Sequence, residues 1–152
     1  MNDIAYYLHK IKEYSQASIA RLATDDSEEE RIRTLYSDAR YRAPHPIFSL
    51  MQLIVGLGVS ANAWEVQLIR GRQETQVNAS INGKMTELTT LPTELYEPLV
   101  ERFIDGAGLV ADRSDYRSGE FCVKWQDKNY VMPLTVTSVD AEEMLTFQIR
   151  AA

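Results

Sequence analysis

The sequence predicts an α+β fold: an antiparallel or mixed sheet of five or six strands packed with helices, plus an N-terminal helical extension. Residues 64–68 and 77–81 alternate apolar and polar side chains in steps of two, as strands with one buried face do. Residues 46–58 are almost wholly apolar and residues 94–105 are amphipathic. Segments of that length and pattern form helices that cover a sheet.

Residues 1–43 are expected to form the extension, as two helices, and residues 44–152 the α+β domain. Within residues 3–23, five apolar side chains recur at helical spacing: Ile4, Tyr7, Leu8, Ile11 and Tyr14. Ser27 to Glu30 form a capping box that starts the second helix, whose apolar side runs from Ile32 to Ala39. We predict that the first helix binds a partner or a second copy of the chain, with Tyr7 and Tyr14 as anchors. The alternative is that it folds back onto the second helix.

The middle of the chain is expected to form three strands and a helix. Gly56 and Gly58 mark either the end of the apolar helix or a close approach to the sheet. Asn82-Gly83 predicts a two-residue hairpin, because both residues tolerate positive φ. Met85 to Leu88 forms the third strand, Leu91-Pro92 ends the extended run, and the next helix ends at Gly106.

Three more strands are expected after a charged loop, over residues 121–125, 130–136 and 145–149. Pro133 cannot donate a ladder hydrogen bond, so its strand should lie at an edge or carry a bulge. The core should consist of the inward side chains: Leu50, Ile54, Trp64, Val66, Val77, Ile81, Leu99, Phe103, Phe121, Val123 and Phe147.

The order of several short motifs resembles the second N-terminal domain of the type II secretion and type IV pilus assembly ATPases. In that family a strand is followed by one that ends in Ile-Asp-Gly, then a Leu-Pro segment, a helix and Ala-Gly-Leu. The counterparts here are Ile81-Asn82-Gly83, Leu91-Pro92 and Ala107-Gly108-Leu109. The resemblance extends from about Pro46 to Ile149. It implies the scaffold of that domain without the ATPase core.

The departures from the family pattern fall on its nucleotide-facing residues. Relatives carry alternating arginines in the second strand, which the resemblance places toward bound nucleotide. The matching positions here are Gln76, Asn78 and Ser80, and none of these side chains can pair with a phosphate as a guanidinium does. The nucleotide-facing chemistry of the family is therefore absent at these positions, and we predict that the three residues contribute to binding a protein partner.

Composition and motifs exclude several classes of function. The chain has 152 residues and a formal charge of −6, which disfavours a nucleic-acid backbone as partner. A phosphate-binding loop, a metal-ligand cluster and a nucleophile elbow are all absent from the sequence, so we expect no catalytic residues, no metal and no cofactor. The single Cys122 cannot form an internal disulfide, and its alternating context predicts a packing or surface residue. No apolar run is long enough to cross a bilayer, and a cytoplasmic location is expected.

Two functions are favoured over a third, an enzyme whose pocket the sequence does not reveal. The first is a non-catalytic adaptor or accessory component of a bacterial secretion or pilus-assembly machine, which binds the machine's ATPase or forms a homodimer. The second is an acidic secretion chaperone that binds an effector or pilin segment along its sheet.

Overall fold

The computed structural model describes residues 3–24, 46–107, 116–139 and 142–152. Its helical elements are α1 (Asp3–Thr24), α3 (Pro46–Ser60), the short 3₁₀ turn η2 (Thr93–Leu95) and α4 (Tyr96–Ala107). Its strands are β1 (Glu65–Arg70), β2 (Glu74–Ile81), β3 (Lys84–Pro92), β4 (Tyr116–Trp125), β5 (Lys128–Val139), β6 (Glu142–Gln148) and β7 (Arg150–Ala151). The second helix predicted in the extension lies outside the described residues, and the extent of the extension stays a prediction.

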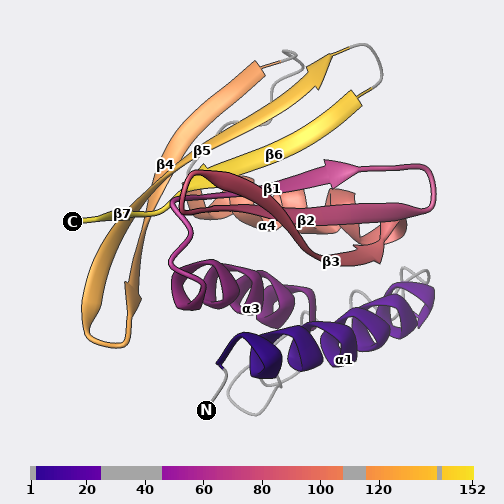
Figure 1. The fold of residues 1–152 in the computed structure, drawn as a ribbon. Helices are drawn as coiled ribbons and strands as arrows, with labels where there is room; N and C mark the ends of the chain where they lie inside the picture. Colours follow the sequence, from indigo (N-terminus) through magenta and orange to yellow (C-terminus); the bar gives the residue numbers. More distant parts are fainter. Residues whose placement is uncertain (1–2, 25–45, 108–115, 140–141) are drawn as a thin grey trace, which may run out of the picture.

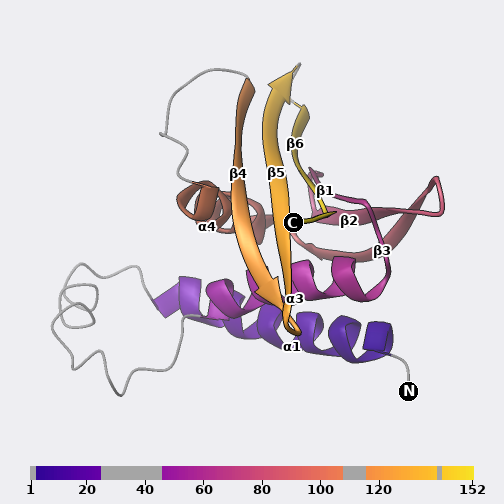
Figure 2. The same ribbon diagram turned by 90° about the vertical axis from the view of Figure 1, so that its left-hand side faces the viewer.

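All strand pairings are antiparallel, and the sheet order is β3-β2-β1-β6-β5-β4, with β7 paired to β5. In Figure 1, α4 lies behind the strands, while α3 and α1 lie below them. Figure 2 shows the same arrangement from the side. The predicted α+β class is confirmed, and the short β7 extends the sheet beyond the predicted five or six strands. None of the described helices combines the length and apolar character that crossing a membrane requires.

Residues with positive φ shape three of the chain reversals. The hairpin turns at Asn82-Gly83 and Gln126-Asp127 have positive φ at both central residues, as tight two-residue turns between twisted strands require. Helix α3 ends at Ser60, and Asn62, two residues beyond, has a φ of 55°. There, the N–H of Ala63 donates to the carbonyl of Gly58 at 3.0 Å and that of Asn62 to Val59 at 3.1 Å. These two bonds form a Schellman motif, which satisfies carbonyls at the helix end.

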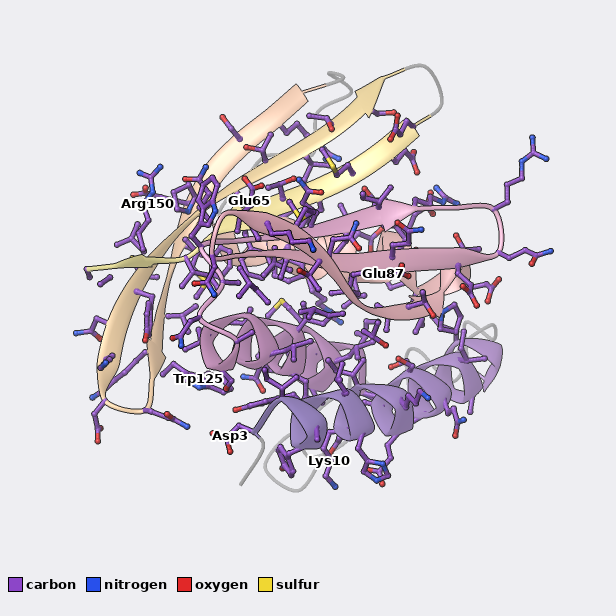
Figure 3. All side chains as sticks on the ribbon, in the orientation of Figure 1. Asp3, Lys10, Glu65, Glu87, Trp125 and Arg150 are labelled. Atoms are coloured by element: carbon purple, nitrogen blue, oxygen red, sulfur yellow. The ribbon has the colours of Figure 1, made fainter. Side chains whose placement is uncertain are left out.

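Other elements pack closely against the backbone of α3 at its two glycines. Of the two alternatives that the sequence left for Gly56 and Gly58, the end of the helix or a close approach, the structure therefore has the close approach. A Cβ on Gly56 would lie 2.5 Å from Cζ2 of Trp125 and 2.7 Å from Cε1 of Tyr7. A Cβ on Gly58 would lie 2.8 Å from Cγ2 of Val66 and 2.9 Å from Cδ1 of Ile149. Figure 3 shows Trp125 at the lower end of the β4-β5 hairpin, beside α3.

The apolar stripe of α1 packs on the chain's own core. Ile11 is fully buried, Tyr7 is 8% exposed, and the rings of Tyr7 and Trp125 are 6.0 Å apart. The remaining members of the stripe, Ile4, Leu8 and Tyr14, are partly buried against the same core. Helix α1 packs along α3. The side chains predicted to anchor a partner are therefore engaged within the chain, and partner binding by this helix stays a prediction.

The predicted core is correct except at Trp64. Val66 and Leu68 are buried on the helix side of the sheet, as the alternation requires, but Trp64 is 52% exposed. The cause is local: β1 begins only at Glu65, and the chain leaves the Asn62 turn with Ala63 in the buried position. Ile81, Phe121 and Val123 are partly buried against the core. Cys122 is exposed.

Two predicted strand features are corrected. Strand β3 continues through Leu91 to Pro92 rather than ending before them, and a register shift opposite Val77 and Asn78 turns Leu91 into the core. Strand β5 is interior, not an edge. Pro133 fits there because it lies beside the break between β6 and β7, where the pairings of β5 stop at Val131 and resume at Leu134.

The close approach at Gly56 predicts opposite effects for the same substitution at two helical glycines. Gly56→Ala should lower the free energy of unfolding by about 1–3 kcal/mol, because the added methyl overpacks the contact with Trp125 and Tyr7. Gly106→Ala, in α4, meets no atom within 4 Å and should raise it by about 0.4–1 kcal/mol. Urea denaturation of both variants measures the difference. Equal effects at the two positions would contradict the close approach.

Candidate functional site

The sheet has one face that no described helix covers (Figure 1). Its four inner strands direct mainly uncharged side chains to that face. The register places outward-facing residues in rows across β2, β1, β6 and β5. We call these twelve residues the open face: Glu65, Gln67, Ile69, Gln76, Asn78, Ser80, Pro133, Thr135, Thr137, Met144, Thr146 and Gln148. Glu65 is the charged residue among them.

The three residues that the resemblance singled out lie together on this face. Gln76 pairs with Ile69, Asn78 with Gln67, and Ser80 with Glu65. Their exposure falls along the strand, from exposed Gln76 to Ser80 at 6%. Oδ1 of Asn78 is buried and accepts no hydrogen bond from the described residues. The prediction that the three share one face is therefore correct, and their binding of a partner stays a prediction.

Trp64 lies at the end of this row, and sequence reasoning placed it in the wrong environment. Its indole Nε1–H donates to Oγ of Ser80 at 2.7 Å. Its backbone is also fixed, because the N–H of Trp64 donates to the carbonyl of Ser80 at 3.1 Å and the N–H of Ile149 donates to the carbonyl of Trp64 at 2.8 Å. An aromatic side chain that is half exposed is thus held in one orientation at the edge of the open face.

The open face is hollowed over β1, β6 and β5. The hollow has a volume of about 250 Å³ and is lined mainly by uncharged residues: Glu65, Gln67, Pro133, Thr135, Thr137, Met144, Thr146 and Gln148. Glu65 is engaged there, since Nε2 of Gln67 donates to its carboxylate at 3.3 Å. The hollow follows the strand direction and offers hydroxyl and amide groups to whatever lies in it.

A second concave region lies on the helix side of the sheet, and no sequence pattern predicted it. Helix α4 and the upper parts of β4, β5 and β6 enclose a cavity of about 560 Å³. Its apolar wall consists of Val100, Ile104 and Val136, all at least nine-tenths buried. Its polar lining includes Tyr96, Glu97, Glu101, Asp105, Arg117 and Glu143.

Arg70 joins three elements beside this cavity. Its Nη1 lies 2.5 Å from Oε2 of Glu143 in β6 and 3.3 Å from Oε1 of Glu97 in α4. Its guanidinium also lies over the ring of Tyr96, 5.7 Å from the centroid. The hydrogen bond to Glu143 is the main cause of the raised pKa of Arg70. The end of β1 is thereby tied to both walls of the cavity.

Tyr96 carries the least satisfied polar group of this region. The residue is 3% exposed, and its hydroxyl has no hydrogen-bond partner among the described residues. Burial raises the pKa of the Tyr96 hydroxyl above its ordinary value, and the nearby Glu143 carboxylate adds to the rise. A tyrosine hydroxyl is protonated at neutral pH even at its ordinary pKa, and burial extends that state of Tyr96 to higher pH. Within the described ranges, no group of three His, Cys, Asp or Glu side chains could hold a metal ion.

The unpartnered hydroxyl predicts that Tyr96→Phe costs little stability. No hydrogen bond to a described residue is lost, so the free energy of unfolding should stay within about 0.5 kcal/mol or rise slightly. Tyr96→Ala removes the buried ring as well and should cost about 3–5 kcal/mol. Chemical denaturation of both variants measures the contrast. A loss above about 1.5 kcal/mol in the Phe variant would show that the hydroxyl has a partner.

No protein-family model matches the chain, and no curated protein matches it. Among solved structures, the chain is similar to the X-ray structure of the Legionella pneumophila ATPase DotB, at 13% sequence identity and a TM-score of 0.44. The similarity covers 68% of this chain and 28% of the DotB chain, so the chain spans only a minor part of that protein's length. The likeness is loose, and no property of DotB passes to this chain on its account.

Proposed function

We propose that this chain is a non-catalytic protein-binding module, an accessory or adaptor component of a bacterial secretion or pilus-assembly machine. It binds another protein of that machine through the open face. The partner we favour is the machine's ATPase, and a secreted substrate is the second choice. The link to such a machine comes from the motif order between Pro46 and Ile149, and the binding surface comes from the geometry of the sheet.

The observation that carries the proposal is Trp64 held half exposed at the edge of an almost uncharged face. The centres of protein interfaces are depleted in charged residues and enriched in aromatic ones. Tryptophan is also among the residues that dominate binding energy, because a large rigid ring buries much area at little cost in conformational entropy. The bond to Ser80 already fixes the indole, so binding would lose little further freedom.

The non-catalytic part of the proposal is supported by the same strand. Gln76, Asn78 and Ser80 occupy the positions where the resembled family has arginines, and the hydroxyl of Ser80 already accepts the indole N–H. A surface of amides and hydroxyls cannot neutralise the charge of a triphosphate. It can pair with the backbone and polar side chains of a protein.

A second candidate, a secretion chaperone, is favoured by the hollow along β1, β6 and β5. A groove that follows the strands and carries paired threonines suits an extended segment of a substrate. In that case the bound chain would lie across Thr135 and Thr146, which are direct partners in the sheet, and the substrate would bind while unfolded.

Truncating Trp64 tests the proposed surface. In calorimetric titration of the purified ATPase from the same organism, Trp64→Ala should weaken binding by about 30-fold or more, because a hot-spot aromatic contributes about 2 kcal/mol or more. Tyr6→Ala is the matched control, since Tyr6 is 56% exposed on α1, away from the open face. If Tyr6→Ala weakens binding and Trp64→Ala does not, the first helix is the interface and the proposal is wrong. If the wild type binds an unfolded substrate but not the ATPase, the chaperone candidate replaces it.

ATP should not bind. Titration of the chain with ATP and magnesium should give no heat beyond dilution, since no arginine lies among the twelve residues of the open face and the phosphate-binding loop is absent from the sequence. Titration with a nucleotide-hydrolysing ATPase under the same conditions is the positive control. Micromolar affinity for ATP would refute the non-catalytic assignment.

A further inference from the structure

Within the part of the chain that the structure describes, four large apolar side chains are exposed, and two of them adjoin Ser80. Trp64 is 52% exposed, and its indole N–H donates to Oγ of Ser80 at 2.7 Å. Met85, in β3, is 43% exposed and is the direct partner of Ser80 in the pairing of β2 with β3. Directly paired residues place their side chains on the same side of a sheet. Met85 therefore continues the surface around Trp64 from the open face onto the edge strand.

We call Trp64, Ser80 and Met85 the apolar corner. Ser80 is 6% exposed and its hydroxyl already accepts the indole N–H, so the surface of the corner is mainly that of the two large side chains. The indole is held in place, whereas a methionine side chain is flexible and polarisable and adapts to what it contacts. The other two exposed apolar side chains, Tyr6 and Phe48, belong to α1 and α3 on the helix side of the sheet.

A carboxylate that no described residue pairs lies beside the apolar corner. Glu87 follows Met85 by two residues and shares its side of β3, about 7 Å along the strand. Its side chain is exposed and makes no ion pair with a described residue. Lys84 pairs with Ile81, which packs on the core, so the lysine side chain leaves β3 on the opposite side.

The next charges across the sheet from the apolar corner are already engaged. Glu65, the partner of Ser80 in β1, accepts a hydrogen bond from Nε2 of Gln67 at 3.3 Å. Arg150 donates to Oε1 of Gln148. Glu87 is therefore the charge beside the corner that is available to another molecule.

We propose that the apolar corner receives one large aliphatic side chain of the protein partner, and that Glu87 pairs with a lysine or arginine about 7 Å away on the same partner. This inference rests on the proposed function, because it names the chemistry of the partner at the edge of the open face. Apolar contact at the corner combined with an opposite charge beside it gives both affinity and selectivity. A second copy of this chain, with its net charge of −6, is a poor occupant.

Three capped tripeptides test this chemistry without the ATPase: Leu-Ser-Lys, Leu-Ser-Glu and Ser-Ser-Lys. In an extended peptide, side chains two residues apart are separated by about 7 Å, which matches Met85 and Glu87. Binding to the full chain is followed by NMR, through the indole N–H of Trp64 and the methyl group of Met85. At about 20 mM, Leu-Ser-Lys should shift both signals and Ser-Ser-Lys neither, since one buried leucine gives only weak binding. Leu-Ser-Lys should bind at least about threefold more tightly than Leu-Ser-Glu.

Two variants assign the preference to the named side chains. Met85→Ala should weaken Leu-Ser-Lys by at least about threefold, because one wall of the corner is lost. Glu87→Gln should bring the affinities for Leu-Ser-Lys and Leu-Ser-Glu to within about twofold of each other. Thr86→Ala is the matched control, since Thr86 is exposed on the same strand but pairs with Ala79 and directs its side chain to the opposite side. It should change neither affinity.

The same variants apply to the ATPase. In calorimetric titration, Met85→Ala should weaken binding by at least about fivefold. Combined with Trp64→Ala, the total loss should be smaller than the product of the two single losses, because both side chains hold the same side chain of the partner.

The outcomes separate this inference from the proposed function. If Trp64→Ala weakens binding of the ATPase while Met85→Ala and Glu87→Gln behave like Thr86→Ala, the open face binds the ATPase and the inference is wrong. If Leu-Ser-Lys binds at the corner but the ATPase does not bind the chain, the inference stands and the proposed partner is wrong. If no tripeptide shifts either signal, or if Leu-Ser-Glu binds as tightly as Leu-Ser-Lys, the inference is overturned.

Discussion

The contact at Gly56 is the constraint on which the arrangement of the helices depends. It brings together three segments that are distant in sequence, because Tyr7 of α1 and Trp125 of β4 both pack against the same backbone position of α3. The long β4-β5 hairpin can reach α3 only if no side chain stands at that position. With α3 fixed there and α4 packed against β4 and β5, the described helices all cover the same side of the sheet. The other side remains open for that reason.

Arg70 also links segments that are distant in sequence, through ion pairs with α4 and β6. It is the last residue of β1, and it points to the helix side because Val66 and Leu68 do. Its ion pairs with Glu97 and Glu143 hold α4 and β6 at a fixed separation. Since Arg70 and Glu143 are about one-third exposed, the pair contributes geometry more than stability. Both partners of Arg70, Glu97 and Glu143, line the neighbouring cavity.

Local sequence patterns predicted the helices and strands better than they predicted the packing of these elements against one another. Alternation and the Asn82-Gly83 turn identify β1 and β2 because these signals act between near neighbours. Trp64 was misplaced because alternation applies only inside the strand, and the turn at Asn62 puts Ala63 in the buried position. Pro133 was assigned to an edge because a break in the partner strand is not visible from its own segment.

The two candidate sites differ in the same way. Gln76, Asn78 and Ser80 share a face because they alternate within one strand, and so the sequence predicts their placement. The residues of the cavity come from α4, β4, β5 and β6. Arg117, Tyr96 and Glu143 carry no mutual spacing that a sequence pattern could reveal, because only the tertiary fold brings them together. The buried, unpartnered hydroxyl that marks this site is a property of packing alone.

The open face remains unexplained by stability or by solubility. A protein surface that serves only solubility usually mixes charges of both signs. This chain has enough charged residues for such a surface, since 25% of its residues are charged and its net charge is −6. They lie elsewhere: Lys84 and Glu87 on the edge strand β3, Glu120 and Lys124 on the edge strand β4, where charges prevent unwanted pairing of edges. The open face between these edges carries mainly amides and hydroxyls, with Glu65 as its charged residue and the fixed Trp64 at its edge. Covering uncharged polar groups costs less desolvation energy than covering charges, and this composition supports our proposal that another protein covers the face.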